Sequence, residues 1–209
     1  MAFSEEHFSR IRPFLFHLTN RNNIGGIRNL GKLHSAAVLM EKAGDSTYLR
    51  QKRIESIEFQ IGKVMVSLRD QQPLYAGNVR LEGGWSFEEF VESLNQRIYF
   101  WPGKQNGPIP YGHRHFQRYV NEGPVIVRIS TGELYRANPG VSPHYCRFNS
   151  GSPRCSNGIP SPRGPNTFIG SAEANYAPSK VIEVTYLTTV NLPSLVEVAD
   201  SIFGPWRKL

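Results

Sequence analysis

The carboxylate of Glu183 stands inside an otherwise nearly apolar segment, VIEVTYL (181–187). That segment predicts a late β-strand. Burying an unpaired charge is costly, so a carboxylate in such a strand needs a reason. It either faces solvent from the wet side of a half-covered sheet or takes part in chemistry. Glu173, in GSAEANY, is the second candidate carboxylate, and it lies in a predicted loop.

Polar residues also follow a short apolar run near the N-terminus, in FLFHLTNRNNIGGIRNL (14–30). Residues 14–16 predict a buried strand that ends at His17, Thr19 follows, and Asn23 opens a helix that Gly31 can end. Polar groups at a strand end and a helix start suit a nucleotide, because the first helical N–H groups are free to bind an anion. Caps, turns and a core histidine would use the same residue types. The residues alone leave both interpretations open.

Basic and aromatic side chains form two further candidate binding segments. Arg50 and Arg53 lie in STYLRQKR (46–53), where a guanidinium fork can bind phosphate bidentately. A solvated basic helix face is the alternative for this segment. Tyr99, Phe100 and Trp101 lie in RIYFW, where aromatic rings can stack on a planar ligand. The alternative is a place in the core, which we favour for Phe100.

The segment 138–180 is rich in Pro, Gly, Ser and Asn and predicts a long loop. A loop of that length inside a compact domain is commonly functional or mobile. We therefore expect it to face a substrate. Arg147, Arg154, Arg163 and Lys180 lie in this segment and are candidates for contacts with phosphates.

Composition limits the class of protein. The 209 residues suit one domain, and a net charge of +7 favours a polyanionic partner such as nucleic acid. His144, Cys146 and Cys155 lack a fourth ligand at zinc-finger spacing, so no metal site is expected. No apolar run is long enough for a membrane helix, and the N-terminus does not resemble a signal peptide. Two cysteines do not form a disulfide framework, so the expected location is the cytoplasm.

The predicted elements include both helices and strands, without internal repeats. A capping box from Ser86 to Glu89 marks the clearest helix start. The expected helices are 4–12, 24–30, a turn within 33–40, 46–53, 86–96 and, as helix or loop, 111–120. The expected strands are 54–59, 63–68, 97–101 ended by Pro102-Gly103, 124–130 and 181–187, with a turn and edge at 131–137.

The N-terminal motif resembles the start of the DarT-type ADP-ribosyltransferases. Those proteins open with a strand, a His-x-Thr motif, an asparagine four residues later, and a helix followed by a Gly-x-Leu turn. The matching positions are His17, Thr19, Asn23, Ile27, Gly31 and Leu33. The chain also resembles an uncharacterised bacterial family with the segments RDQQPL (69–74) and RIYFW (97–101). The first of these departs from the DarT pattern, and we expect only a structural ion pair between Arg69 and Asp70.

The resemblance implies an α+β fold, the split β-sheet fold of ADP-ribosyltransferases, as a single domain over residues 1–209 with NAD in a central cleft. It implies that Glu183 is catalytic, because these enzymes carry their glutamate near the start of a late strand. His17 and Thr19 would hold the adenosine-side ribose or the nicotinamide amide. Arg53, with Arg50 as the fallback, matches the arginine that holds NAD in these enzymes and would bind the pyrophosphate. Asn23 and Tyr99 would line the same cleft. No metal is implied.

The resemblance also implies a function and partners. The expected activity is transfer of ADP-ribose from NAD to a base of DNA or RNA, as in toxins paired with a macrodomain antitoxin. A protein acceptor and an NAD-dependent RNA 2'-phosphotransferase are the alternative enzymes. A binding module for single-stranded nucleic acid, which uses basic and aromatic residues, is the alternative without catalysis.

Overall fold

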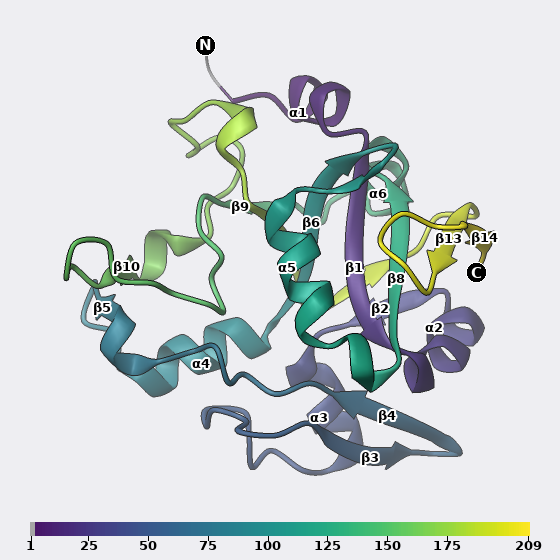
Figure 1. Ribbon diagram of the computed structural model, residues 1–209, viewed down its shortest axis with the longest axis horizontal. Helices are drawn as coiled ribbons and strands as arrows, with labels where there is room; N and C mark the ends of the chain where they lie inside the picture. The colour runs from purple at the N-terminus through teal and green to yellow at the C-terminus, as the bar shows by residue number, and fades with distance from the viewer. Residues whose placement is uncertain (1–2) are drawn as a thin grey trace.

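The computed structural model describes residues 3–209, which form an α+β fold around one large, mainly antiparallel sheet (Figure 1). The strand order across this sheet is β14-β13-β8-β1-β6-β11-β9, with β7 paired to β6. Its strands are β1 (Phe14–Asn20), β6 (Arg97–Lys104), β7 (Gly107–Pro108), β8 (Pro124–Ser130), β9 (His144–Cys146), β11 (Glu183–Leu187), β13 (Val196–Ala199) and β14 (Arg207–Lys208).

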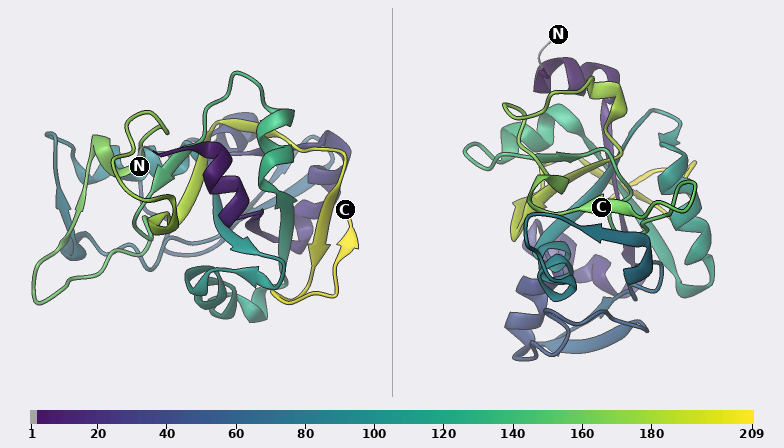
Figure 2. Two further views of the ribbon diagram at one scale, coloured as in Figure 1. Left: turned by 90° about the horizontal axis from the view of Figure 1, so that it is seen from above. Right: turned by 90° about the vertical axis from the view of Figure 1, so that its left-hand side faces the viewer.

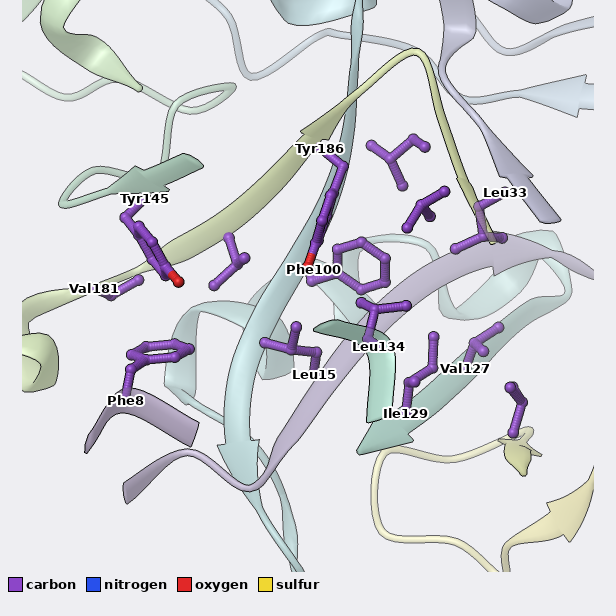
Figure 3. Packing of buried hydrophobic residues seen from close by; sticks show 14 of the residues in the cluster. Phe8, Leu15, Leu33, Phe100, Val127, Ile129, Leu134, Tyr145, Val181 and Tyr186 are labelled. Carbon is purple, nitrogen blue, oxygen red and sulfur yellow. The ribbon is translucent and has the colours of Figure 1, made fainter. Parts of the chain in front are cut away.

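The strand β1 lies at the centre of the sheet, between β8 and β6. Because side chains alternate along a strand, Leu15, His17 and Thr19 share one face of β1. Leu15 packs into the main apolar core with Phe100, and Figure 3 shows both side chains in that cluster with Tyr186. Phe16 and Leu18 belong to a second core on the other face. The apolar face of β1 thus changes to a polar one at His17.

Six helices and several short strands surround the sheet over residues 3–209 (Figure 1). The serines Ser4, Ser35, Ser86 and Ser130 each cap a helix through the side chain. The helices are α1 (Glu5–Ile11), α2 (Ile24–Leu30), α3 (Ala36–Ala43), α4 (Phe87–Asn95), α5 (Pro110–Arg118) and α6 (Thr131–Ala137). No helix in this part of the chain is long and apolar enough to cross a membrane.

Three two-stranded sheets lie beside the large one. The hairpin of β3 and β4 lies with α3 at one end of the molecule (Figure 1). Figure 2 shows β5 and the segment around β10 at the end away from the C-terminus. The pairs are β2 (Lys32–His34) with β12 (Thr189–Asn191), β3 (Ile57–Ile61) with β4 (Val64–Leu68), and β5 (Val79–Leu81) with β10 (Ser161–Arg163).

The segment 138–180 is mostly irregular, as expected, but it is tied to the rest of the fold. Its strand β9 pairs with β11, and β10 pairs in parallel with β5. Two 3-10 helices, Pro165–Thr167 and Pro178–Lys180, add further local order. The segment is therefore part of the folded domain, with backbone pairing at two places.

Several predicted boundaries were wrong because pairing with distant segments overrides local signals. β1 continues past His17 to Asn20 along the whole of β8. β6 continues through Pro102 and Gly103, where a Cβ at Gly103 would overlap the ring of Phe16.

Two short segments also differ from their predicted type. Residues 131–137 form the helix α6, capped by Ser130, rather than a turn and edge. Residues 46–53 form turns rather than a helix. For residues 46–53, Asn95 donates to the carbonyls of Tyr48 and Leu49, and Gln71 accepts from the Arg53 N–H, so residues far away in sequence hold this shape.

Candidate functional site

A cavity of about 510 Å³ opens between β1, β4, β6 and the α2–α3 region. Ligand sites in proteins are commonly about 300–1,000 Å³ in volume. The cavity collects side chains from segments up to 166 positions apart in sequence. Among its lining residues are all six that the sequence singled out for NAD or catalysis: His17, Thr19, Asn23, Arg53, Tyr99 and Glu183.

Glu183 is the first residue of β11 and its side chain is only 3 % exposed. The backbone N–H of Ser150 donates to both carboxylate oxygens, at 3.2 Å each. Burial raises the pKa of Glu183 to about 7, although Ser150 and the nearby Arg163 oppose the shift. The carboxylate therefore faces the cavity and not a wet sheet face, and it is partly protonated near neutral pH. Glu173 is exposed and does not line the cavity.

His17 presents a neutral imidazole to the cavity. Burial lowers the pKa of His17 to about 4. Its Nδ1 lies 2.9 Å from the carbonyl oxygen of Tyr99. A carbonyl only accepts, so this nitrogen must carry the ring proton. The tautomer leaves Nε2 as a hydrogen-bond acceptor for a hydroxyl or an amide N–H.

Asn23 joins the start of α2 to β4. Its Nδ2 donates to Thr19 Oγ1 at 3.0 Å and to the carbonyl of Ser67 at 2.9 Å, and its Oδ1 accepts from the Ser67 N–H at 2.8 Å. Asn23 stands at the N-cap position, but its side chain makes no cap bond. Since its amide is occupied on both sides, Asn23 positions Thr19 and the cavity wall, and the expected direct contact with a ligand is not favoured.

Arg53 brings a buried positive charge to the cavity, with only 6 % of the residue exposed. Its Nε donates to the carbonyl of Arg69 at 2.9 Å, and its Nη1 donates to Asn95 Oδ1 at 2.8 Å. Burial lowers the pKa of Arg53 to about 10, so the guanidinium stays charged at neutral pH. It forms no ion pair within the described residues. The fallback, Arg50, is paired with Glu92 instead.

Asn95, which we did not single out from the sequence, is the hub behind Arg53. It is 1 % exposed and ends α4. Its Nδ2 donates to the carbonyls of Tyr48 and Leu49 at 2.9 Å each, and its Oδ1 also accepts from Gln71 Nε2 at 3.2 Å. The sequence does not reveal these hydrogen bonds of Asn95, because every partner is at least 24 positions away from it.

The RDQQPL segment lines the cavity and fixes the Arg53 backbone. Gln71 Oε1 accepts from the Arg53 N–H at 3.1 Å. Arg69 donates to the carbonyl of Leu18 at 3.0 Å, and its guanidinium lies over the Tyr119 ring. The ion pair expected between Arg69 and Asp70 is not formed; Asp70 instead accepts from the hydroxyl of Tyr119. The segment thus supports the site by hydrogen bonds.

The aromatic residues of β6 divide between the cavity and the core. Tyr99 and Trp101 line the cavity, whereas Phe100 is fully buried in the core, as preferred from the sequence. The Tyr99 hydroxyl donates to the carbonyl of Leu94 at 3.0 Å, and its ring lies edge-on to Phe168. Tyr99 therefore offers its ring surface to a ligand, while its backbone carbonyl orients His17.

The predicted phosphate-binding residues do not all come together. Arg147, Arg154 and Arg163 line a second pocket of about 260 Å³, but Lys180 lines neither cavity. Arg163 is buried, and its guanidinium donates to Ser161 Oγ, the Pro162 carbonyl and the Asn149 carbonyl at 2.7–3.1 Å. We therefore correct the role of Arg163: it supports the loop next to Ser150 rather than extending toward an acceptor.

The chain belongs to a protein family described as a family of unknown function (DUF7002), whose model matches residues 13–198. Neither a curated protein nor a solved structure matches the chain. Within residues 3–209, no three His, Cys, Asp or Glu side chains cluster closely enough to hold a metal ion.

Replacing Glu183 by Gln should stabilise the ligand-free protein at alkaline pH. A pKa of about 7 in the folded protein, against an ordinary value of 4.5 for Glu, means that ionisation of Glu183 opposes folding. The penalty is absent below pH 4.5, grows between pH 4.5 and 7, and is complete above pH 7, where it is about 3 kcal/mol. Urea unfolding at pH 8 and pH 4.5 measures it. An equal stability difference at both pH values would contradict the burial of this carboxyl.

Replacing Asn95 by Ala should destabilise the protein by about 2–3 kcal/mol, because buried donors and an acceptor lose their partners together. Asn22→Ala is the matched control: Asn22 is exposed, although its side chain also bonds to Glu58 and Ser67. The control should cost about 0.5 kcal/mol or less. Urea unfolding at neutral pH compares the two. Equal losses would remove Asn95 as the hub behind Arg53.

Proposed function

We propose that this protein is an NAD-consuming ADP-ribosyltransferase, of the glycosyltransferase class, that modifies a base of a nucleic acid. The observation that carries the proposal is the meeting of Glu183, His17 and Arg53 in one cavity. Each has the charge state that the chemistry requires near neutral pH: a carboxyl that is partly ionised, a neutral imidazole and a guanidinium cation. The resemblance to DarT-type enzymes joins these residues to one reaction.

The cavity suits NAD as a substrate in volume and in polarity. Arg53 supplies a guanidinium without a carboxylate partner, which a pyrophosphate can neutralise. His17 Nε2 accepts a hydrogen bond, from a ribose hydroxyl or from the nicotinamide amide. Tyr99 lines the same cavity and has an aromatic ring on which a planar group can stack. The cavity therefore contains a suitable group for the pyrophosphate, for a ribose or the nicotinamide amide, and for one planar ring of NAD.

Glu183 performs the central step in this proposal. NAD supplies ADP-ribose when its bond between ribose and nicotinamide breaks, through a transition state with positive charge on the ribose ring, as in glycoside cleavage. The Glu183 carboxylate stabilises that charge and accepts a hydrogen bond from the ribose hydroxyl. It then takes the proton that the acceptor nitrogen loses as it bonds to the ribose carbon. The Ser150 N–H holds the carboxylate in place for both tasks.

The fold supports the same proposal. The two central strands, β1 and β6, carry His17 and Tyr99, and the neighbouring β11 begins with Glu183. A catalytic glutamate at the start of a late strand, after a long irregular segment, is the arrangement that the resemblance implies. We propose on this ground that the antiparallel sheet is the split sheet of an ADP-ribosyltransferase.

The proposal also covers the acceptor, the cellular location and the partner of the enzyme. A net charge of +7 favours a nucleic acid as the acceptor. Both cysteines are free thiols, which suits a reducing cytoplasm. By resemblance, the enzyme acts as a toxin or in defence, with a macrodomain antitoxin as its partner.

The test is transfer of label from NAD carrying a labelled adenine to single-stranded DNA and RNA. Glu183→Gln should lower the transfer rate by about 10²–10³-fold while the protein still binds NAD. Glu173→Gln is the matched control, since Glu173 is exposed, and it should keep the normal rate. For the unaltered protein, kcat/KM should rise with pH through about 7, because the ionised form of Glu183 is active.

Each other outcome points to a different protein. Label in protein alone would identify a protein ADP-ribosyltransferase. Removal of a 2'-phosphate from RNA would identify a phosphotransferase. No consumption of NAD, beside salt-sensitive binding of single strands, would leave a binding module. A normal rate in Glu183→Gln would remove this carboxylate from the mechanism.

A further inference from the structure

A second pocket, the arginine pocket, lies directly beside the NAD cavity. Its volume is about 260 Å³, and no Asp or Glu lines it. Two of its arginines, Arg114 and Arg118, come from the exposed side of α5, which the sequence did not suggest. Its charged and aromatic lining residues are Tyr111, Arg114, Arg118, Arg147, Phe148, Arg154 and Arg163.

The exposed arginines of this pocket are not neutralised by the protein. Over residues 3–209, the ion pairs use other arginines: Arg21, Arg50, Arg80, Arg128 and Arg207. The arginine side chains that converge on this pocket repel each other. A bound anion offsets this repulsion because it attracts every one of them. The arginine pocket is therefore built for a ligand with more than one negative charge.

The arginine pocket shares part of its lining with the NAD cavity. Pro73, His115, Asn149 and Ser152 line both. Asn149 and Ser152 flank Ser150, whose N–H holds the Glu183 carboxylate. A chain-like ligand with its charged part in the arginine pocket would thus have its next unit at the entrance to the cavity.

The aromatic residues of the pocket distinguish a nucleic acid from other polyanions. Tyr111 is exposed and lies 4.6 Å below the Arg114 guanidinium, and the ring of Phe148 lies 4.5 Å from Arg163. Single-strand binders combine arginines along the backbone with rings on which bases stack. A phosphorylated peptide would use the arginines but has no bases to place on these rings.

We infer that the arginine pocket binds phosphates of a single-stranded nucleic-acid acceptor and so brings the neighbouring nucleotide into the cavity beside Glu183. The inference rests on the proposed function for the role of that nucleotide. Arg114 and Arg118 hold the strand from α5, and Arg147 and Arg154 hold it from the loop before Glu183. Single strands are preferred, because chemistry on a base requires the base to be outside the stack.

Fluorescence anisotropy with DNA and RNA strands of about eight nucleotides tests the pocket without any need for NAD. Arg114→Gln/Arg118→Gln should weaken binding about tenfold or more and flatten the log–log salt slope by about 1.4, which is two phosphate contacts. Arg28→Gln/Arg136→Gln removes the same charge from two exposed arginines that line neither cavity, and it should bind almost normally. Arg147→Gln/Arg154→Gln, which removes the two arginines contributed by the loop before Glu183, should weaken strand binding to a similar extent.

NAD affinity, measured by calorimetry on the same variants, should stay unchanged. An equal loss of strand binding in the control pair would overturn the inference, since charge alone would then explain it. A parallel loss of NAD affinity would assign the pocket to the phosphates of NAD instead. Tighter binding of a phosphopeptide than of any strand would also overturn it. Arginine-dependent strand binding in a protein that does not bind NAD would support the pocket and refute the proposed function alone.

Discussion

The Glu183 carboxyl is buried with a single backbone N–H, that of Ser150, as its direct hydrogen-bond donor. In the same cavity the Arg53 guanidinium is buried, and no carboxylate within residues 3–209 forms an ion pair with it. Both burials cost free energy that the ligand-free protein does not recover. A ligand that carries a phosphate for Arg53 and a developing positive charge for Glu183 recovers both costs. The proposed function depends on these two buried charged groups, Glu183 and Arg53, neither of which is paired with an opposite charge in the part of the chain that the structure describes.

The fold keeps this arrangement by means of amides rather than ion pairs. Asn95 joins α4 to the turn segment that ends at Arg53, and Asn23 joins α2 to β4. Such amides donate and accept at once, so each satisfies backbone groups of one neighbouring segment and also bonds to other side chains, without adding charge to the cavity. Because the neutral side chains of Asn95 and Asn23 connect the segments, the charged side chains of Arg53 and Glu183 are not needed for ion pairs within the fold.

Much of the candidate site was predictable from local sequence, whereas the residues that hold its side chains in place were not. The carboxylate in an apolar strand marked Glu183, and the polar residues after the apolar run 14–16 marked His17 and Thr19. The structure brings all three to one cavity. Asn95 and the α5 arginines were missed, because their roles arise from contacts with distant segments. Boundaries such as the end of β1 failed for the same reason, since β8 pairs with the whole strand. Local periodicity predicts elements, whereas long-range pairing decides where they end.

The most direct measurement is a crystal structure of the Glu183→Gln protein with NAD bound. The account predicts NAD in the cavity, with its pyrophosphate on Arg53, a hydrogen bond to His17 Nε2, and the ribose carbon that bears nicotinamide within about 3.5 Å of the side chain at position 183. NAD bound in the arginine pocket or elsewhere on the surface would contradict it. So would a cavity without NAD at a concentration that saturates the protein in solution.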